Sequence, residues 1–208
     1  MTCPGADKSC GHSTDSPMTN PPQRLLDDHH HHDAKIRVLW DLVDFPVPEG
    51  YSIRDIVGSV LRREGYTGEL SITAYGETDP YPAEDGFTFV QNSDKYLRLS
   101  KILVDAAFWA LENPLPYLKP APSLMVVAKN CDQQTEFVDF LQNLYNLTFQ
   151  IFLVLPDDCC PEKLGIPKVN LAWYWTSLLE GGKPIPRTEL KCLFARVKPS
   201  PANIFRRI

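Results

Sequence analysis

Residues 36–41 read Ile36-Arg-Val-Leu-Trp-Asp41, a short apolar run that ends on a carboxylate. After the loop Pro46-Val-Pro-Glu-Gly50, Ser52 precedes apolar residues that recur at helical spacing. The run is typical of a buried strand, and the spacing predicts an amphipathic helix that ends at Gly65. Together they predict the first strand and helix of an α/β domain.

Strand and helix patterns alternate through the rest of the chain. Further strands are expected at 70–75, 124–128 and 151–155, and further helices near 99–113, 132–145 and 173–180. This order predicts a mainly parallel, doubly wound central sheet with helices on both faces. In such sheets ligands bind beyond the carboxyl ends of the strands, so the residues that follow each strand are the candidates for function.

The chain divides into three parts by composition. Residues 1–33 are polar and lack periodicity, so we expect a disordered tail, while 34–182 should form the folded domain. Residues 183–208 contain seven Lys or Arg and one acid, a basic extension that either contacts phosphates or is a solvated end. The net charge of −5 excludes the molecule as a whole as an electrostatic nucleic-acid binder.

Composition also predicts the compartment. The sequence shows neither a signal peptide nor an apolar run long enough for a membrane span, so no membrane partner is expected. Two of the six cysteines, Cys159 and Cys160, are adjacent, which suits a disulfide framework poorly. These features predict an intracellular protein, cytoplasmic or nuclear, with reduced thiols.

The types of residue available restrict the chemistry. All five histidines precede Asp33, so the expected domain has none. That excludes Ser-His-Asp and Cys-His mechanisms and histidine-ligated zinc enzymes. No Walker loop is present, and no G-x-G-x-x-G follows the first strand. Carboxylates are what remains for catalysis.

Several carboxylates fall close to the expected strand ends. Asp41 ends the first strand, Asp44 follows it, and Asp105 lies on the helix before the third strand. Asp132 follows the third strand, two residues after Asn130. Oxygen ligands of this kind bind Mg²⁺, which can orient a water and stabilise charge on a phosphodiester.

Each acid also has a purely structural interpretation. Asp132 or Asn130 could cap the third helix, and Asp105 could pair with Lys101 one turn earlier. Asp41, at a buried strand end, requires a partner of some kind because a buried carboxylate without one is costly.

Four stretches carry a resemblance to a known family. The chain resembles a plant NYN domain, of the PIN-like nuclease branch related to the limkain-type meiosis regulator and mRNA stability factor, from about Ile36 to Gly182. The matching stretches are Trp40-Asp-Leu-Val-Asp-Phe-Pro-Val-Pro48, Ile72-Thr-Ala-Tyr-Gly76, Lys101-Ile-Leu-Val-Asp105 with Phe108-Trp-Ala-Leu111, and Trp173-Tyr-Trp-Thr-Ser-Leu-Leu-Glu-Gly-Gly182.

The resemblance implies a three-layer α/β/α PIN-like (Rossmann-like) fold. It further implies cleavage of single-stranded RNA, dependent on Mg²⁺ or Mn²⁺, in the regulation of gene expression and mRNA stability. Asp41 and Asp105 fall on the family's first two acids, and Asp132 keeps one acid of the third motif. Some relatives associate with peroxisomes, and larger members carry RNA-binding modules that a protein partner would have to supply here.

The third motif departs from the family at two positions. Asn130 replaces an acid, which removes one negative charge and should weaken metal binding. Lys129 replaces a glycine and could repel a metal or contact a phosphate. Asp44 replaces an asparagine in the first motif and adds a carboxylate nearby.

Two hypotheses follow. In the first, the protein is a metal-dependent endoribonuclease with a partly substituted site. Its catalytic residues are Asp41, Asp105, Asp132 and Asn130, and its metal ligands are Asp41, Asp105, Asp132 and Asp44. In the alternative, it is a catalytically inactive pseudo-nuclease that binds RNA or a protein partner. The residues expected to contact RNA are Lys129, Lys183, Arg187 and Lys191.

Overall fold

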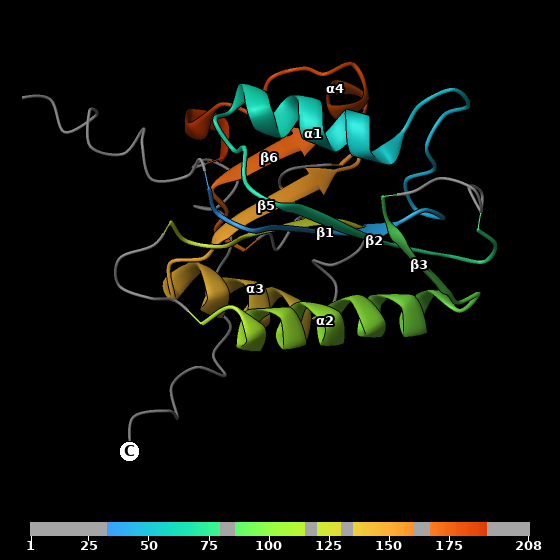
Figure 1. Cartoon of the computed structure of the whole chain (residues 1–208), viewed down its shortest axis with the longest axis horizontal. Helices are drawn as coiled ribbons and strands as arrows, with labels where there is room; N and C mark the ends of the chain where they lie inside the picture. Colours follow the sequence, from blue (N-terminus) through green and yellow to red (C-terminus); the bar gives the residue numbers. More distant parts are fainter. Residues whose placement is uncertain (1–32, 80–85, 115–119, 130–134, 160–166, 191–208) are drawn as a thin grey trace, which may run out of the picture.

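The centre of the molecule is a six-stranded sheet in which every neighbouring pair of strands is parallel. The computed structural model describes residues 33–79, 86–114, 120–129, 135–159 and 167–190. The strand order is β3-β2-β1-β4-β5-β6 (Figure 1). The strands are β1 (Ile36–Asp41), β2 (Leu70–Gly76), β3 (Thr88–Gln91), β4 (Ser123–Val127), β5 (Gln150–Leu155) and β6 (Leu171–Tyr174).

Helices cover both faces of the sheet. Figure 1 shows α1 (Ile53–Arg63) and α4 (Trp175–Leu179) on one face, and α2 (Lys95–Glu112) and α3 (Thr135–Asn146) on the other. The predicted three-layer α/β/α arrangement with a parallel sheet is therefore confirmed. No helix among the described residues is both long and apolar enough to cross a bilayer.

Successive residues of each strand enter two separate cores. In β1, Val38 and Trp40 pack beneath α1, whereas Leu39 packs beneath α2. This alternation with a period of two, buried on both sides, is what a parallel sheet between helical layers requires. The apolar stripe expected on the first helix is buried as predicted, at Ile53, Ile56, Val57, Val60 and Leu61.

The predicted elements differ from the structure in two strands. The sequence pattern does not predict β3, because this strand has only four residues and lies partly exposed at the sheet edge. The predicted helix at 173–180 was wrong at its start: Trp173 and Tyr174 belong to β6, and α4 begins at Trp175. Trp173 is fully buried against Phe152 of β5, so packing against the sheet fixes this segment as a strand.

The ends of α1 agree with the predicted boundaries. Ser52 is the N-cap residue, although its side chain makes no capping hydrogen bond. Gly65 follows the helix with a φ of 87°, a left-handed conformation that glycine adopts without strain. The helix thus ends where the sequence places its glycine.

The strand order creates one topological switch point. From β1 the chain builds β2 and β3 on one side, and then crosses to build β4, β5 and β6 on the other. In doubly wound sheets, the crevice at the carboxyl ends of the two central strands is the usual ligand position. Here those strands are β1 and β4, and Asp41 ends β1.

Candidate functional site

Asp41 lies at the switch point, and both oxygens of its carboxylate are occupied. The side chain has no exposed surface. Its Oδ1 accepts hydrogen bonds from the backbone N–H groups of Val43 at 3.0 Å and Asp44 at 3.3 Å. Its Oδ2 accepts one from Arg98 Nε at 2.9 Å. The partner expected for this buried acid is therefore an arginine together with the backbone of the following turn.

Arg98 comes from α2 and is almost as deeply buried as Asp41. Only 2% of its side chain is exposed. Its Nη1 donates to the backbone carbonyls of Ser93 at 2.8 Å and Asn92 at 3.3 Å. A buried charge is tolerated when it is paired and hydrogen-bonded, and both Nε and Nη1 of Arg98 donate to acceptors within reach.

Asp44 connects the loops that follow β1 and β4. Its Oδ2 accepts the backbone N–H of Lys129 at 2.9 Å, and its Oδ1 lies 3.1 Å from Lys95 Nζ. The Lys129 ammonium lies 5.3 Å from the centroid of the Phe45 ring, within the range of a cation–π contact. The loop after β1 is thus fixed across the switch point.

Asp105 makes the ion pair that the sequence predicts. Its Oδ1 lies 2.7 Å from Lys101 Nζ. Its Oδ2 accepts a hydrogen bond from the Tyr75 hydroxyl at 2.7 Å. Burial raises the pKa of the Tyr75 phenol well above its ordinary value, and the hydrogen bond to Asp105 raises that pKa further. Tyr75 therefore stays protonated at neutral pH and acts as the donor.

The three pairs form a row along one helix, which we call the α2 ion-pair row. It consists of Lys95–Asp44, Arg98–Asp41 and Lys101–Asp105. The cations recur every three residues on α2, so they lie along the side of the helix that passes the ends of β1 and β2. Each candidate carboxylate within the described ranges already has a cationic partner.

Three of the expected metal ligands, Asp41, Asp44 and Asp105, are described by the structure. Each forms an ion pair with a lysine or arginine side chain of α2. Within the described part of the chain, no three His, Cys, Asp or Glu residues are grouped so that they could hold a metal ion. Asn130 and Asp132 lie outside the described residues. The described acids alone therefore do not form a centre for Mg²⁺ or Mn²⁺.

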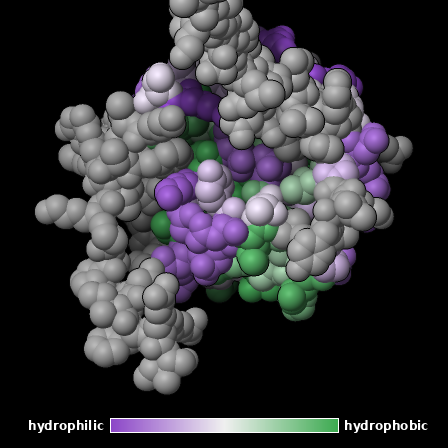
Figure 2. Space-filling model, turned by 90° about the vertical axis from the view of Figure 1, so that its left-hand side faces the viewer, coloured by the Kyte–Doolittle hydropathy of each residue, from purple (hydrophilic) through white to green (hydrophobic). Residues whose placement is uncertain are grey.

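The residues expected to contact RNA do not gather in one place. Lys129 lies at the switch point, but the exposed Lys183 lies beside Ser177 of α4. The exposed Arg187 lies near Tyr66, which precedes β2 at the opposite end of the sheet. There the last residue of α1, Arg63, donates to the carbonyl of Gly181. Figure 2 views this end, where the strands begin, and shows exposed hydrophilic residues. Lys191 lies outside the described residues.

Two contacts define how the basic extension joins the domain. The N–H of Ile185 donates to the carbonyl of Ala172 in β6 at 2.7 Å, and Leu190 is buried in the core beneath α2 and α3. Arg187 lies near Tyr66, where it partly offsets the burial that raises the tyrosine's pKa to about 12. The first residues of the extension thus pack on the domain.

Sequence reasoning missed three residues of this site: Lys95, Arg98 and Tyr75. One signal could have found Arg98, which falls in line with Ile102 and Trp109 on the buried stripe of α2. An arginine on a core-facing stripe indicates a buried acid nearby. Tyr75 carried no such signal, because a tyrosine in a strand is ordinary.

Comparison with known proteins adds no relative. No family model matches the chain, and no curated protein or solved structure matches it either. The fold and site by themselves define a three-layer α/β/α, Rossmann-like domain. Its distinguishing feature is a buried aspartate–arginine pair at the switch point.

Proposed function

We propose that this protein is a pseudo-nuclease, a domain of PIN-like type that binds single-stranded RNA without cutting it. The observation that carries the proposal is the state of Asp41. Its Oδ2 is bound by Arg98 and its Oδ1 by two backbone N–H groups, with no surface open to solvent. The acid on which metal-dependent cleavage would depend is used to join α2 to β1.

A metal ion at Asp41 would have to displace the Arg98 guanidinium from the carboxylate. To ligate a cation, Asp41 would have to release Arg98, which would leave the guanidinium buried without its counter-ion. Breaking a buried pair in this way costs about 3–5 kcal/mol. A divalent ion close to the bound guanidinium would instead be repelled by it. Both routes disfavour the metal-dependent endoribonuclease as an account of this site.

The other described acids support the same conclusion. Asp44 uses one oxygen for Lys95 and the other for the backbone of Lys129. Asp105 uses one oxygen for Lys101 and the other for Tyr75. Magnesium demands near-ideal octahedral geometry and keeps several waters, so it needs carboxylates with oxygens to spare.

Cations at the rim of the site supply the RNA-binding chemistry. Lys95 and Lys101 are paired with Asp44 and Asp105, but 37% and 46% of their side chains are exposed, and each ammonium has further N–H donors for a phosphate. The Lys129 ammonium contacts the Phe45 ring and has no carboxylate partner among the described residues. Lysines placed this way bind phosphate oxygens without reading sequence, and their binding weakens with salt. A site with so few cations binds weakly, which agrees with a protein partner that supplies further RNA-binding modules.

The direct test is RNA binding in the absence of metal. Fluorescence anisotropy would follow a labelled single-stranded RNA during titration with the full chain, once with EDTA and once with Mn²⁺. The proposal predicts the same dissociation constant in both buffers and weaker binding by Lys129→Ala. RNA binding that disappears in EDTA would overturn the proposal.

A further inference from the structure

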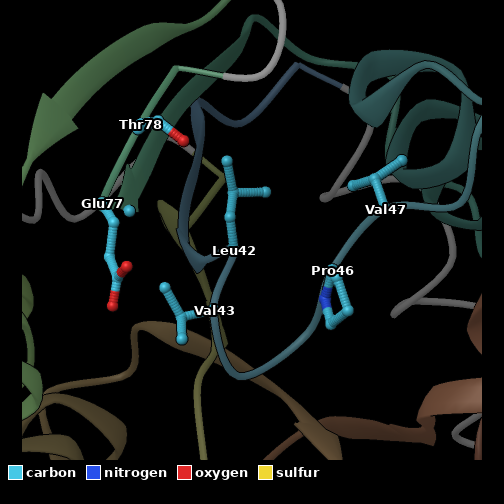
Figure 3. A pocket seen from close by; sticks show the side chains of 7 residues that line it. Leu42, Val43, Pro46, Val47, Glu77 and Thr78 are labelled. Atoms are coloured by element: carbon cyan, nitrogen blue, oxygen red, sulfur yellow. The ribbon is translucent and has the colours of Figure 1, made fainter. Parts of the chain in front are cut away.

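A small pocket lies beside the α2 ion-pair row, at the carboxyl ends of β1 and β2. Its volume is about 300 Å³, at the lower end of the range for small-molecule sites, roughly 300–1,000 Å³. A single planar base is a ligand of suitable size. The pocket is lined by Leu42, Val43, Pro46, Val47, Gly76, Glu77 and Thr78 (Figure 3).

The walls of the pocket differ in polarity. Figure 3 shows Glu77 and Thr78 on one side, Pro46 and Val47 on the other, and the Leu42–Val43 segment between them. Val43 is 46% exposed, although valine normally gains by burial. The apolar wall suits the face of a ring, and the polar wall suits its edge.

The carboxylate of Glu77 is available for a ligand. The backbone of this segment is fixed, because Gln91 Nε2 donates to the Glu77 carbonyl at 2.9 Å and Asn92 N donates to the Gly76 carbonyl at 2.7 Å. The Glu77 side chain itself has neither a hydrogen bond nor an ion pair with any described residue. It therefore differs from the three acids of the α2 ion-pair row, each of which is paired.

We infer that this pocket binds a guanine base of the RNA, an inference that rests on the proposed function. An ionised carboxylate is acceptor-only and presents two oxygens side by side. Guanine carries two adjacent donors, N1–H and the N2 amino group, and pairs with both oxygens. Adenine and cytosine place a ring acceptor beside their amino group, and uracil places carbonyls on both sides of its single N–H. Guanine is therefore the only one of the four bases that can donate to both Glu77 oxygens without placing one of its own acceptors against the carboxylate.

The pocket and the phosphate-binding cations share one loop. Leu42, Val43, Pro46 and Val47 line the pocket, and Asp44 of the same loop holds the backbone of Lys129. A single strand that crosses this loop can place one base in the pocket and a neighbouring phosphate at the Lys129 ammonium. Single-stranded RNA is read in this way, with bases splayed out and bound by their edges.

The first experiment locates the ligand. Methyl-labelled full-length protein would be titrated with guanosine, adenosine, cytidine and uridine 5′-monophosphates, and NMR shifts followed. Guanosine monophosphate should move the methyl signals of Leu42, Val43 and Val47. It should leave those of Val104 and Leu147, which are also exposed but lie on α2 and after α3. Equal shifts with all four nucleotides, or none at the pocket, would overturn the inference.

The second experiment uses RNA and separates this inference from the proposed function. The ligands are A-rich single strands that contain one guanosine, or inosine, which lacks the N2 amino group, at the same position. Guanosine should bind at least about fivefold tighter than inosine, the lower limit for a bidentate pair. Glu77→Gln should abolish that preference. The matched control Glu112→Gln, at the far end of α2, should retain it.

Each result has one meaning. If RNA binds but guanosine has no advantage, or if Glu77→Gln keeps the advantage, the guanine site is wrong and the pseudo-nuclease proposal stands. If no RNA binds at all, both fail. Unchanged urea midpoints for Glu77→Gln and Glu112→Gln would establish that both variants are folded, since both side chains are exposed.

Discussion

Arg98 Nε lies 2.9 Å from Oδ2 of Asp41, although the two residues are 57 positions apart in the chain. The contact joins the first turn of α2 to the last residue of β1, at the switch point of the sheet. Both side chains are buried, with 2% of Arg98 and 0% of Asp41 exposed to solvent. The carboxylate at the switch point is therefore enclosed in a buried ion pair.

Asp41→Asn should destabilise the domain by about 3–5 kcal/mol, because the substitution leaves the Arg98 guanidinium buried without its counter-ion. Urea unfolding followed by circular dichroism measures the change in free energy of unfolding. Asp105→Asn is the matched control: the Lys101–Asp105 pair is partly exposed, so this substitution should cost less than about 1 kcal/mol. Equal costs for the two variants would contradict the structural role of Asp41.

The pair should also show strong energetic coupling. Arg98→Met alone leaves Asp41 buried with only its backbone donors. The double variant Asp41→Asn with Arg98→Met removes both charges, and should be less destabilised than the sum of the single variants by about 1–3 kcal/mol. Additive costs in this double-mutant cycle would mean that the two side chains do not interact.

Divalent metals should leave the thermal stability unchanged. A ligand that binds only the folded state stabilises it by RT ln(1 + [L]/Kd), about 2.7 kcal/mol at a hundredfold excess over Kd. Because each described acid of the α2 ion-pair row is paired, millimolar Mg²⁺ or Mn²⁺ should not raise Tm relative to EDTA. A metal-dependent rise that Asp105→Asn abolishes would show that a metal centre forms around these acids.

Lys129→Ala should weaken RNA binding equally for all sequences. Removing one lysine–phosphate pair should make the slope of log K against log salt shallower by about 0.7 for a single strand. Lys168→Ala is the control, since this exposed lysine lies in the loop before β6. Anisotropy titrations over a range of salt concentrations measure the slope for each variant. A Lys168→Ala effect as large as that of Lys129→Ala would place the RNA elsewhere.

Alkaline pH should unfold the protein partly through its buried tyrosines. Burial raises the pKa of Tyr75, and that of Tyr66 to about 12, above the value near 10 of an unfolded tyrosine. A raised folded-state pKa gives full stability below about pH 10, and stability is lost as the pH rises from there through the folded-state value. Each such tyrosine adds a loss of about 1.4 kcal/mol per pH unit in that window.

Tyr75→Phe isolates one of these contributions. It should cost about 1 kcal/mol at pH 7, because it removes the hydrogen bond to Asp105. Above pH 10 its stability should fall less steeply than that of the unchanged protein, by about 1.4 kcal/mol per pH unit. Urea unfolding at a series of pH values measures both slopes, and identical slopes would mean that Tyr75 titrates normally.

The sequence predicts the layers of this fold well because burial alternates strongly in the long elements. Periodicity correctly predicts the apolar strand at 36–41 and the buried stripe on α1. β3 and β6 have only four residues each, too few for a period-two pattern to be distinctive. Their strand conformation depends on pairing with β2 and β5.

The candidate site could be predicted only in part. Local spacing predicts the Lys101–Asp105 pair, which lies within one helix. The need of Asp41 for a partner followed from its position at a buried strand end. The sequence could not predict that Arg98 is this partner, because the contact depends on how α2 crosses β1 in three dimensions. The position of α2 also decides whether these carboxylates are free to bind a metal ion or are paired with a lysine or arginine side chain.

Whether the protein cuts RNA is measured by incubating labelled single-stranded RNA with the full chain in Mg²⁺ or Mn²⁺. EDTA and Asp105→Asn, a variant expected to fold, serve as controls, and products are separated on a denaturing gel. We predict that the RNA is recovered intact under every condition. Cleavage that needs the metal and is lost in Asp105→Asn would contradict the account and establish a metal-dependent endoribonuclease.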